Sequence, residues 1–105
     1  MRVIPLQQVP SQTLAVSLGG QSCQIDIYQK LSGLYCNLYV NNSLIIGGVI
    51  CENANRIVRS TYLGFLGDLA FLDNIGEDDP VYTGFGDRFS FIYLELVDLI
   101  NLGLA

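Results

Sequence analysis

Apolar and polar positions alternate strictly over the first third of the chain. Residues 14–18 place Leu and Val at every second position, and residues 23–27 do the same with Cys and Ile after Gly19-Gly20. A period of two is typical of a strand with one buried face, and a glycine pair suits a two-residue turn. The pattern therefore predicts a hairpin over residues 12–29.

The alternation continues beyond this hairpin. Residues 34–40 alternate after a predicted turn at 30–33, and residues 43–51 form a further apolar segment after Asn41-Asn42. Asparagine tolerates the positive φ of a tight turn. Two glycines inside a strand indicate a bulge or a sharp bend, which we expect at Gly47-Gly48.

The second half of the chain has shorter segments. Residues 52–60 are polar and predict a connection, whereas residues 61–65 and 69–72 predict two short strands. Residues 73–80 combine Asn, Gly, Pro and acidic side chains, which is typical of a loop. Residues 88–97 return to alternation and predict a last strand.

The C-terminal segment, residues 96–105, allows two interpretations. Leu96, Leu99 and Ile100 lie at the spacing of one face of a short helix, or the segment is an apolar arm that packs on a neighbour. Residues 1–105 are expected to form a single all-β domain. We expect a small antiparallel β-sandwich or a partly open β-barrel of about seven or eight short strands.

Composition indicates that other chains cover part of the surface. The 105 residues are 50% hydrophobic and only 14% charged, with a formal net charge of −5; an ordinary soluble domain is about 25% charged. Residues 1–60 carry four basic and two acidic side chains, and residues 61–105 carry one basic and eight acidic. We expect a homo-oligomer or a component of a hetero-complex. The alternative is a monomer with a surface of Ser, Thr, Asn and Gln.

The same composition excludes several classes of function. The absence of histidine excludes Ser-His-Asp and Cys-His catalysis and imidazole metal sites. Five basic residues are too few for a nucleic-acid footprint. No apolar run approaches the roughly 18 residues of a membrane span, and the N-terminus lacks the apolar core of a signal peptide. We therefore expect no membrane span, no bound nucleic acid and synthesis in the cytoplasm.

The three cysteines and the acidic cluster do not predict a metal site. Cys23, Cys36 and Cys51 form no CxxC pair, and their odd number favours buried, reduced thiols over a disulfide framework. A loop containing Asp73, Glu77, Asp78 and Asp79 offers oxygen ligands for calcium but lacks the spacing of an EF-hand. A solvated loop that discourages edge pairing is the favoured interpretation. We expect no cofactor.

Neither glycines nor carboxylates supply a catalytic motif. Gly84-Phe85-Gly86 lacks the third glycine and the following helix of a dinucleotide site, so it predicts a turn. Pairs of carboxylates occur by chance in any chain with ten acids. No group of residues offers a nucleophile, a base and an electrophile stabiliser together, so we expect no catalytic residues and no enzymatic activity.

Three tyrosines share one side of the predicted strands. Tyr28, Tyr35 and Tyr39 lie opposite the apolar set. Tyrosine offers a large contact area with a polar tip and is enriched in protein interfaces. A protein contact is favoured here, and sugar binding is the alternative.

Several short motifs cover most of residues 2–94. They are Ile4-Pro5-Leu6, the segment from Pro10 to Gln21 with Leu18-Gly19-Gly20-Gln21, the strand from Cys23 to Ile27, Asn37-Leu38-Tyr39, Gly47-Gly48-Val49, Tyr62-Leu63-Gly64, Gly67-Asp68-Leu69 and Arg88-Phe89-Ser90-Phe91. In their order and spacing these motifs resemble the phage baseplate plug family, whose members are small proteins of contractile-tail bacteriophages. Tyr35 stands where the family often has tryptophan, and residues 96–105 have no firm counterpart.

The resemblance implies a non-enzymatic virion structural protein in or near the tail baseplate, made in the host cytoplasm and in contact with other tail proteins. Expected contact residues are Tyr28, Tyr35 and Tyr39, the acidic loop with Asp73, Glu77, Asp78 and Asp79, and Leu96, Leu99 and Ile100. The alternative function is a small β-barrel module that binds a ligand or carbohydrate. An unrecognised hydrolase ranks last.

Overall fold

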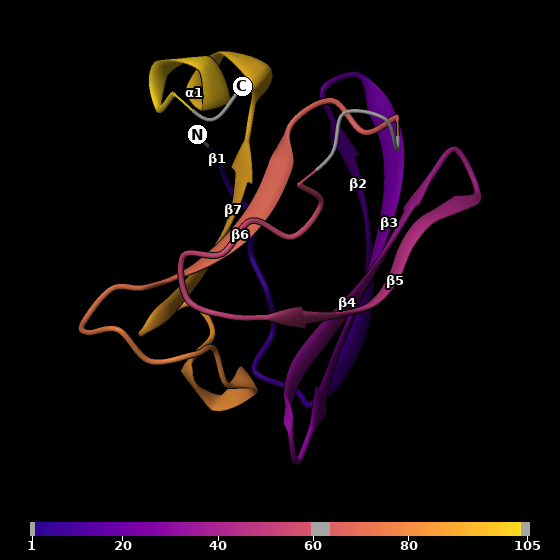
Figure 1. The fold of residues 1–105 in the computed structure, drawn as a ribbon. Coiled ribbons are helices and arrows are strands. Elements are labelled where there is room, and N and C mark those ends of the chain that lie inside the picture. The colour runs from indigo at the N-terminus through magenta and orange to yellow at the C-terminus, as the bar shows by residue number, and fades with distance from the viewer. Residues whose placement is uncertain (1, 60–63, 104–105) are drawn as a thin grey trace.

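Two antiparallel sheets make up the fold, as the computed structural model shows for residues 2–59 and 64–103 (Figure 1). One sheet has four strands in the order β2-β3-β4-β5, and the other has three in the order β1-β7-β6. The sheets are separate, so the sandwich interpretation holds and the barrel is not closed. The elements are β1 (Arg2–Val3), β2 (Ser11–Leu18), β3 (Gln21–Lys30), β4 (Gly33–Val40), β5 (Ser43–Cys51), β6 (Asp68–Asp73), the 3₁₀ helix η2 (Tyr82–Gly84), β7 (Phe89–Leu94) and α1 (Leu96–Asn101).

Tight turns join the strands of the four-stranded sheet. Gly19 and Gly20 connect β2 to β3 with φ values of 58° and 77°, and Asn41 and Asn42 connect β4 to β5 with φ values of 51° and 68°. Two consecutive positive φ values match the twist of a two-residue hairpin. Both predicted hairpin turns are confirmed.

The glycine pair in β5 forms the expected irregularity. The register of β4 against β5 shifts between Cys36, which pairs with Val49, and Leu38, which pairs with Ile46, so Gly47-Gly48 lie opposite Asn37. Gly48 has a φ of 64°, and its backbone N–H donates to Asn37 Oδ1 at 2.8 Å. An asparagine side chain therefore replaces the strand partner that the bulge removes.

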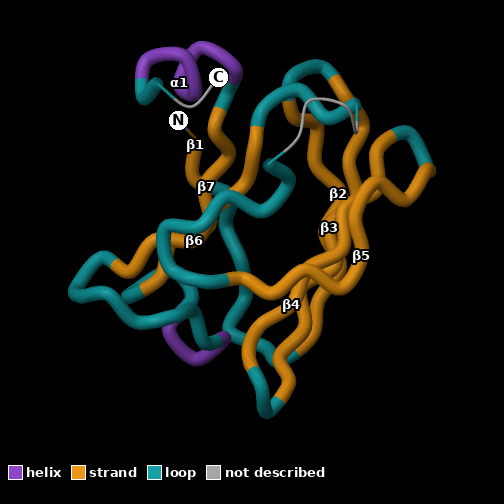
Figure 2. The backbone as a smooth tube through the Cα atoms, in the orientation of Figure 1, coloured by secondary structure: helices purple, strands orange, loops and turns teal. Residues whose placement is uncertain are grey.

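The core joins aliphatic side chains of one sheet to aromatic side chains of the other. Phe71 stacks on Phe91, with ring centroids 4.6 Å apart, and on Phe85 at 5.7 Å. Figure 2 shows the two sheets with loops and short helices at their ends. The core includes Ile25, Ile27, Leu34, Leu38 and Val40 from the larger sheet, and Phe71, Phe89, Phe91 and Tyr93 from the smaller one.

The smaller sheet also has an apolar outer face. Ala70, Ile92 and Leu94 form a second buried cluster there with Leu99 of α1. Alternate residues of β7 thus enter two different apolar clusters, which is why nearly the whole strand is hydrophobic. Helix α1 closes one end of this outer face.

Three expectations for the second half require correction. The predicted strand at 61–65 falls partly on residues 60–63, outside the described residues, and Gly64 and Phe65 are not in a strand. The acidic segment begins inside β6, which ends at Asp73. The last strand stops at Leu94 because the Asp98 side chain accepts a hydrogen bond from the Glu95 N–H at 3.0 Å and caps α1. Within residues 96–105, for which the sequence left a short helix or an apolar arm open, Leu96–Asn101 form the helix α1.

A buried aspartate fixes the connection between the sheets. Asp68 is 2% exposed and accepts hydrogen bonds from the backbone N–H groups of Val58, Arg59 and Leu69 at 2.7–2.9 Å. Arg56 Nη1 lies 4.0 Å from its carboxylate. Within residues 2–59 and 64–103, every buried side-chain nitrogen or oxygen has a partner.

Replacing Asp68 should destabilise the fold strongly. Asp68→Ala removes the acceptor of three backbone N–H groups, two of them buried, so we expect a loss of about 2–4 kcal/mol in the free energy of unfolding, measured by urea denaturation. Asp68→Asn retains one acceptor oxygen and should lose less. Asp87→Ala, at an exposed position, is the control and should stay within about 0.5 kcal/mol of the wild type. An Asp68→Ala protein as stable as this control would contradict the assignment.

Candidate functional site

Two tyrosines and a lysine lie together on the outer face of the larger sheet. Tyr28 of β3 and Tyr35 of β4 are directly paired, with ring centroids 5.9 Å apart and planes inclined by 19°. The Lys30 ammonium lies over both rings, 5.5 Å and 5.3 Å from their centroids. Ile50 of β5 lies beside Tyr35 on the same face and is 40% exposed. We call Tyr28, Lys30, Tyr35 and Ile50 the tyrosine platform.

Polar side chains fix the sheet next to this platform. Asp26 accepts hydrogen bonds from Thr13 Oγ1 at 2.9 Å and from Asn37 Nδ2 at 3.1 Å. The Tyr35 hydroxyl lies 2.8 Å from Ser32 Oγ, and the Tyr28 hydroxyl donates to Asn37 Oδ1 at 3.5 Å. Both rings are therefore held in place before any partner arrives, which lowers the entropy cost of a contact.

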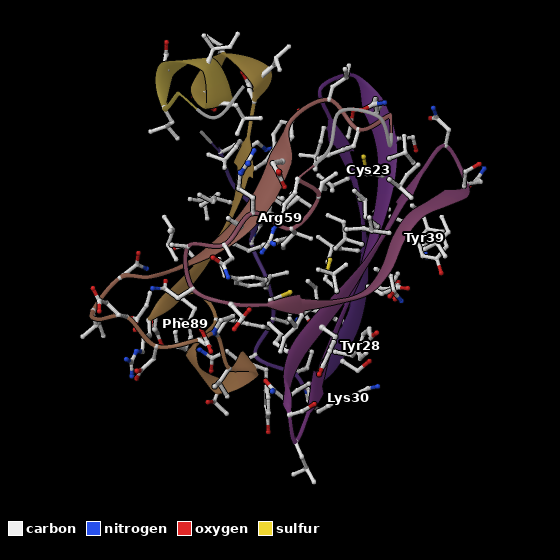
Figure 3. All side chains as sticks on the ribbon, viewed as in Figure 1. Cys23, Tyr28, Lys30, Tyr39, Arg59 and Phe89 are labelled. Atoms are coloured by element: carbon white, nitrogen blue, oxygen red, sulfur yellow. The ribbon has the colours of Figure 1, made fainter. Side chains whose placement is uncertain are left out.

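Tyr39 shares this face but does not join the platform. It pairs with Gln24 of β3 and Leu44 of β5, at the opposite end of β4 from Tyr35. Figure 3 shows Tyr39 pointing away from the space between the sheets. The structure brings together two of the three predicted tyrosines, and adds Lys30, which the sequence pattern did not single out.

The acidic loop, residues 73–79, is an ordered structure built around one arginine. Arg88 Nε and Nη2 donate to the two oxygens of Asp73 at 3.0 Å and 2.8 Å, and Nη2 also donates to Asp78 at 2.7 Å. The Asp73 side chain is fully buried, whereas that of Asp78 is 73% exposed. Hydrogen bonds from Arg88 hold the pKa of Asp73 well below its ordinary value.

The tip of the loop presents an apolar residue among acids. Ile75 is 78% exposed, and Glu77 is also exposed. Asp79 is used differently, because it accepts the Asn53 N–H at 3.0 Å and ties the loop to the connection after β5. Of the four predicted acids, Asp73 braces the loop from inside, and the other three face solvent.

Helix α1 leaves most of its apolar residues uncovered. Leu99 is 4% exposed, but Leu96, Val97, Ile100 and Leu102 are 46–59% exposed. Val3 of β1 is 62% exposed and pairs with Ile92, which also packs with Leu99. The exposed residues form what we call the helix patch: Val3, Leu96, Val97, Ile100 and Leu102.

The remaining candidate motifs have structural explanations. A Cβ at Gly84 would approach the Phe89 ring within 2.7 Å, and Gly86 has a φ of 83°, so both glycines serve the turn into β7. A pocket between β1 and β7 has a volume of about 60 Å³, whereas small-molecule sites measure about 300–1,000 Å³. In the part of the chain that is described, no group of three or more Cys, Asp or Glu could hold a metal, and no helix could span a membrane.

The three cysteines are buried and form no disulfide, as expected. Burial raises the pKa of Cys23, and hydrogen bonding with Cys36, together with burial, raises the pKa of Cys51. Such thiols are protonated at neutral pH and are poor nucleophiles.

Comparison with known protein families indicates where this chain belongs. The sequence matches the family described as "Cyanophage baseplate Pam3 plug gp18" over residues 1–96. The chain belongs to this family. It is therefore assigned to the structural components of a phage tail baseplate, which act in contact with other tail proteins. No curated protein matches the chain.

The extent of the family match separates the surfaces into two groups. The tyrosine platform and the acidic loop lie inside residues 1–96, whereas most of the helix patch lies beyond residue 96. Sequence patterns missed Lys30, Ile75 and Arg88 as members of these surfaces. Only Arg88 had a local signal, because it is the single basic residue among the acids of the second half.

The Asp73–Arg88 pair should make stability depend on acid pH. The pKa of Asp73 is lower in the folded protein than in the unfolded chain, so the pair stabilises the fold at neutral pH and loses this effect as the pH falls below about 4. The difference in unfolding free energy between wild type and Asp73→Asn should be largest near neutrality and shrink toward about pH 2. Urea denaturation across this pH range measures it.

Asp78→Asn is the matched control for this prediction. It removes the exposed part of the same cluster and should have a smaller effect, since exposed ion pairs contribute little. A difference between wild type and Asp73→Asn that is independent of pH would contradict the role of the ionised pair.

Proposed function

We propose that this chain is a non-catalytic plug at the hub of a contractile-tail baseplate, and that it acts by burying its exposed surfaces against neighbouring tail proteins. Membership of the baseplate plug family supports the location. The observation that carries the mode of action is the helix patch, where five large apolar side chains are 46–62% exposed on a chain that has few charges.

The position of the patch explains how such a contact would work. Leu99 anchors α1 on the outer face of β7, while Ile100 and Val97 face away from that cluster and are exposed. Apolar area that solvent covers in the free chain becomes a favourable contribution when a partner excludes the water. The helix thus presents exposed apolar side chains that a partner can cover.

The small volume of the pocket between β1 and β7 gives no support to the alternative, a ligand-binding module. On the tyrosine platform the Lys30 ammonium lies over both rings. A sugar stacking on those faces would have to displace it. The charged lysine fits a protein partner better than a neutral carbohydrate.

Introducing a charged residue into the helix patch should weaken binding to neighbouring tail proteins. Ile100→Asp and Val97→Asp would place an unpaired charge in an apolar interface, so we expect roughly tenfold less co-purification with neighbouring hub and tube proteins. Affinity capture after co-expression, and mass spectrometry of purified tails, measure the effect. Asn101→Asp adds the same charge at an exposed polar position of the same helix and should have little effect. Equal incorporation of all three variants would overturn the proposal.

A further inference from the structure

Two surfaces of this chain are complementary to one another in charge, and both include exposed apolar side chains. The tyrosine platform has flat aromatic area, an apolar neighbour in Ile50 and a cation, Lys30. The acidic loop has an apolar tip, Ile75, next to the exposed acids Glu77 and Asp78. An apolar tip with an acidic rim suits an aromatic surface with a basic rim.

The two surfaces cannot meet within one molecule. Figure 1 shows the loop after β6 projecting from one side of the fold, whereas the turn between β3 and β4, beside Lys30, projects from another. Each copy therefore carries one platform and one loop that are both available to other copies. Repetition of one such contact between different surfaces builds a ring when the rotation closes.

We propose that the acidic loop of one copy docks on the tyrosine platform of a second copy, in a head-to-tail contact. This inference rests on the proposed structural function and deepens it by naming the partner of two surfaces that the helix patch does not use. Glu77 pairs with the neighbour's Lys30 and draws its ammonium away from the two rings. Ile75 then lies against Tyr28, Tyr35 and Ile50 of the neighbour.

Both surfaces are ordered before they meet. Arg88 bridges Asp73 and Asp78 on one side of the loop, and the Asn53 N–H holds Asp79. On the platform, Ser32 and Asn37 hold the two tyrosine hydroxyls. Little conformational entropy is lost on docking, so a contact of modest area suffices for weak, reversible association.

The unequal distribution of charge fits this arrangement. The first 60 residues carry a net positive charge, and the remainder carries most of the acids. Asp26 lies on the same face as the platform, but its oxygens already accept hydrogen bonds from Thr13 and Asn37. It lies on the side of Tyr28 away from Lys30 along β3, so an incoming acid approaches the lysine and not the aspartate.

Charge reversal with compensation tests the contact. In sedimentation velocity of the purified full chain at low salt, the wild type should self-associate with increasing concentration and less at high salt. Lys30→Glu alone and Glu77→Lys alone each replace an attraction by a repulsion between like charges, so each should weaken self-association by roughly tenfold. The double variant Lys30→Glu/Glu77→Lys, and an equimolar mixture of the two single variants, should restore it to within about threefold of the wild type.

A separate substitution tests the apolar part of the proposed contact. Ile75→Ser should weaken self-association several-fold, whereas Val81→Ser, which removes an exposed apolar residue at the end of the same loop region, should not. Far-UV circular dichroism and thermal unfolding of each variant confirm that the fold is retained.

Three results would overturn the inference. They are a wild-type chain that stays monomeric at every concentration in low salt, single reversals without effect, and single reversals that the double variant does not restore. Each of these leaves the proposed function standing, because Ile100→Asp tests the helix patch through capture of other tail proteins. Conversely, loss of that capture with intact self-association separates the two surfaces.

Discussion

The contact between the aromatic face of β6-β7 and the aliphatic face of the larger sheet is the interaction on which the other features depend. Phe71 stacks on both Phe85 and Phe91, so three distant parts of the second half are joined at one point. Large rings contribute more buried area per residue than aliphatic side chains, and a chain of this size needs that contribution. With the aromatic residues inside, the tyrosines of β3 and β4, whose hydroxyls hydrogen-bond to neighbouring polar groups, lie on the outside.

Some of the few charged side chains stabilise the fold itself. Three of the fifteen charged side chains hold backbone that lacks regular partners: Asp68 holds the connection after β5, and Asp73 with Arg88 holds the loop after β6. Ions used in this way do not coat the surface. The apolar side chains of the helix patch stay exposed in the chain itself, and in our proposal neighbouring tail proteins cover them.

Local patterns predict the larger sheet well because its strands are adjacent in sequence and joined by two-residue turns. The two-residue turns require positive φ, which Gly19-Gly20 and Asn41-Asn42 tolerate, so neighbouring residues alone fix both the turn and the register. The second half is less predictable because its strands are apolar on both faces, which weakens the period of two in β6 and β7. The start of α1 depends on the Asp98 side chain capping Glu95, which the alternation around residues 88–97 hides.

The tyrosine platform illustrates what a one-dimensional pattern leaves out. Alternation places Tyr28, Tyr35 and Tyr39 on one face, but only the pairing register decides that Tyr28 meets Tyr35 and that Tyr39 meets Gln24. Lys30 joins the cluster because it is two residues from Tyr28 on the same side and has a flexible side chain that bends back over both rings. The same reasoning applies to the acidic loop. Arg88 binds Asp73 inside the loop, so Asp73 is not a contact residue, and Ile75 is the residue that faces outward. Side chains that make hydrogen bonds or packing contacts within the fold are therefore not available to a partner. The exposed side chains beside them form the surfaces that a neighbouring chain can contact.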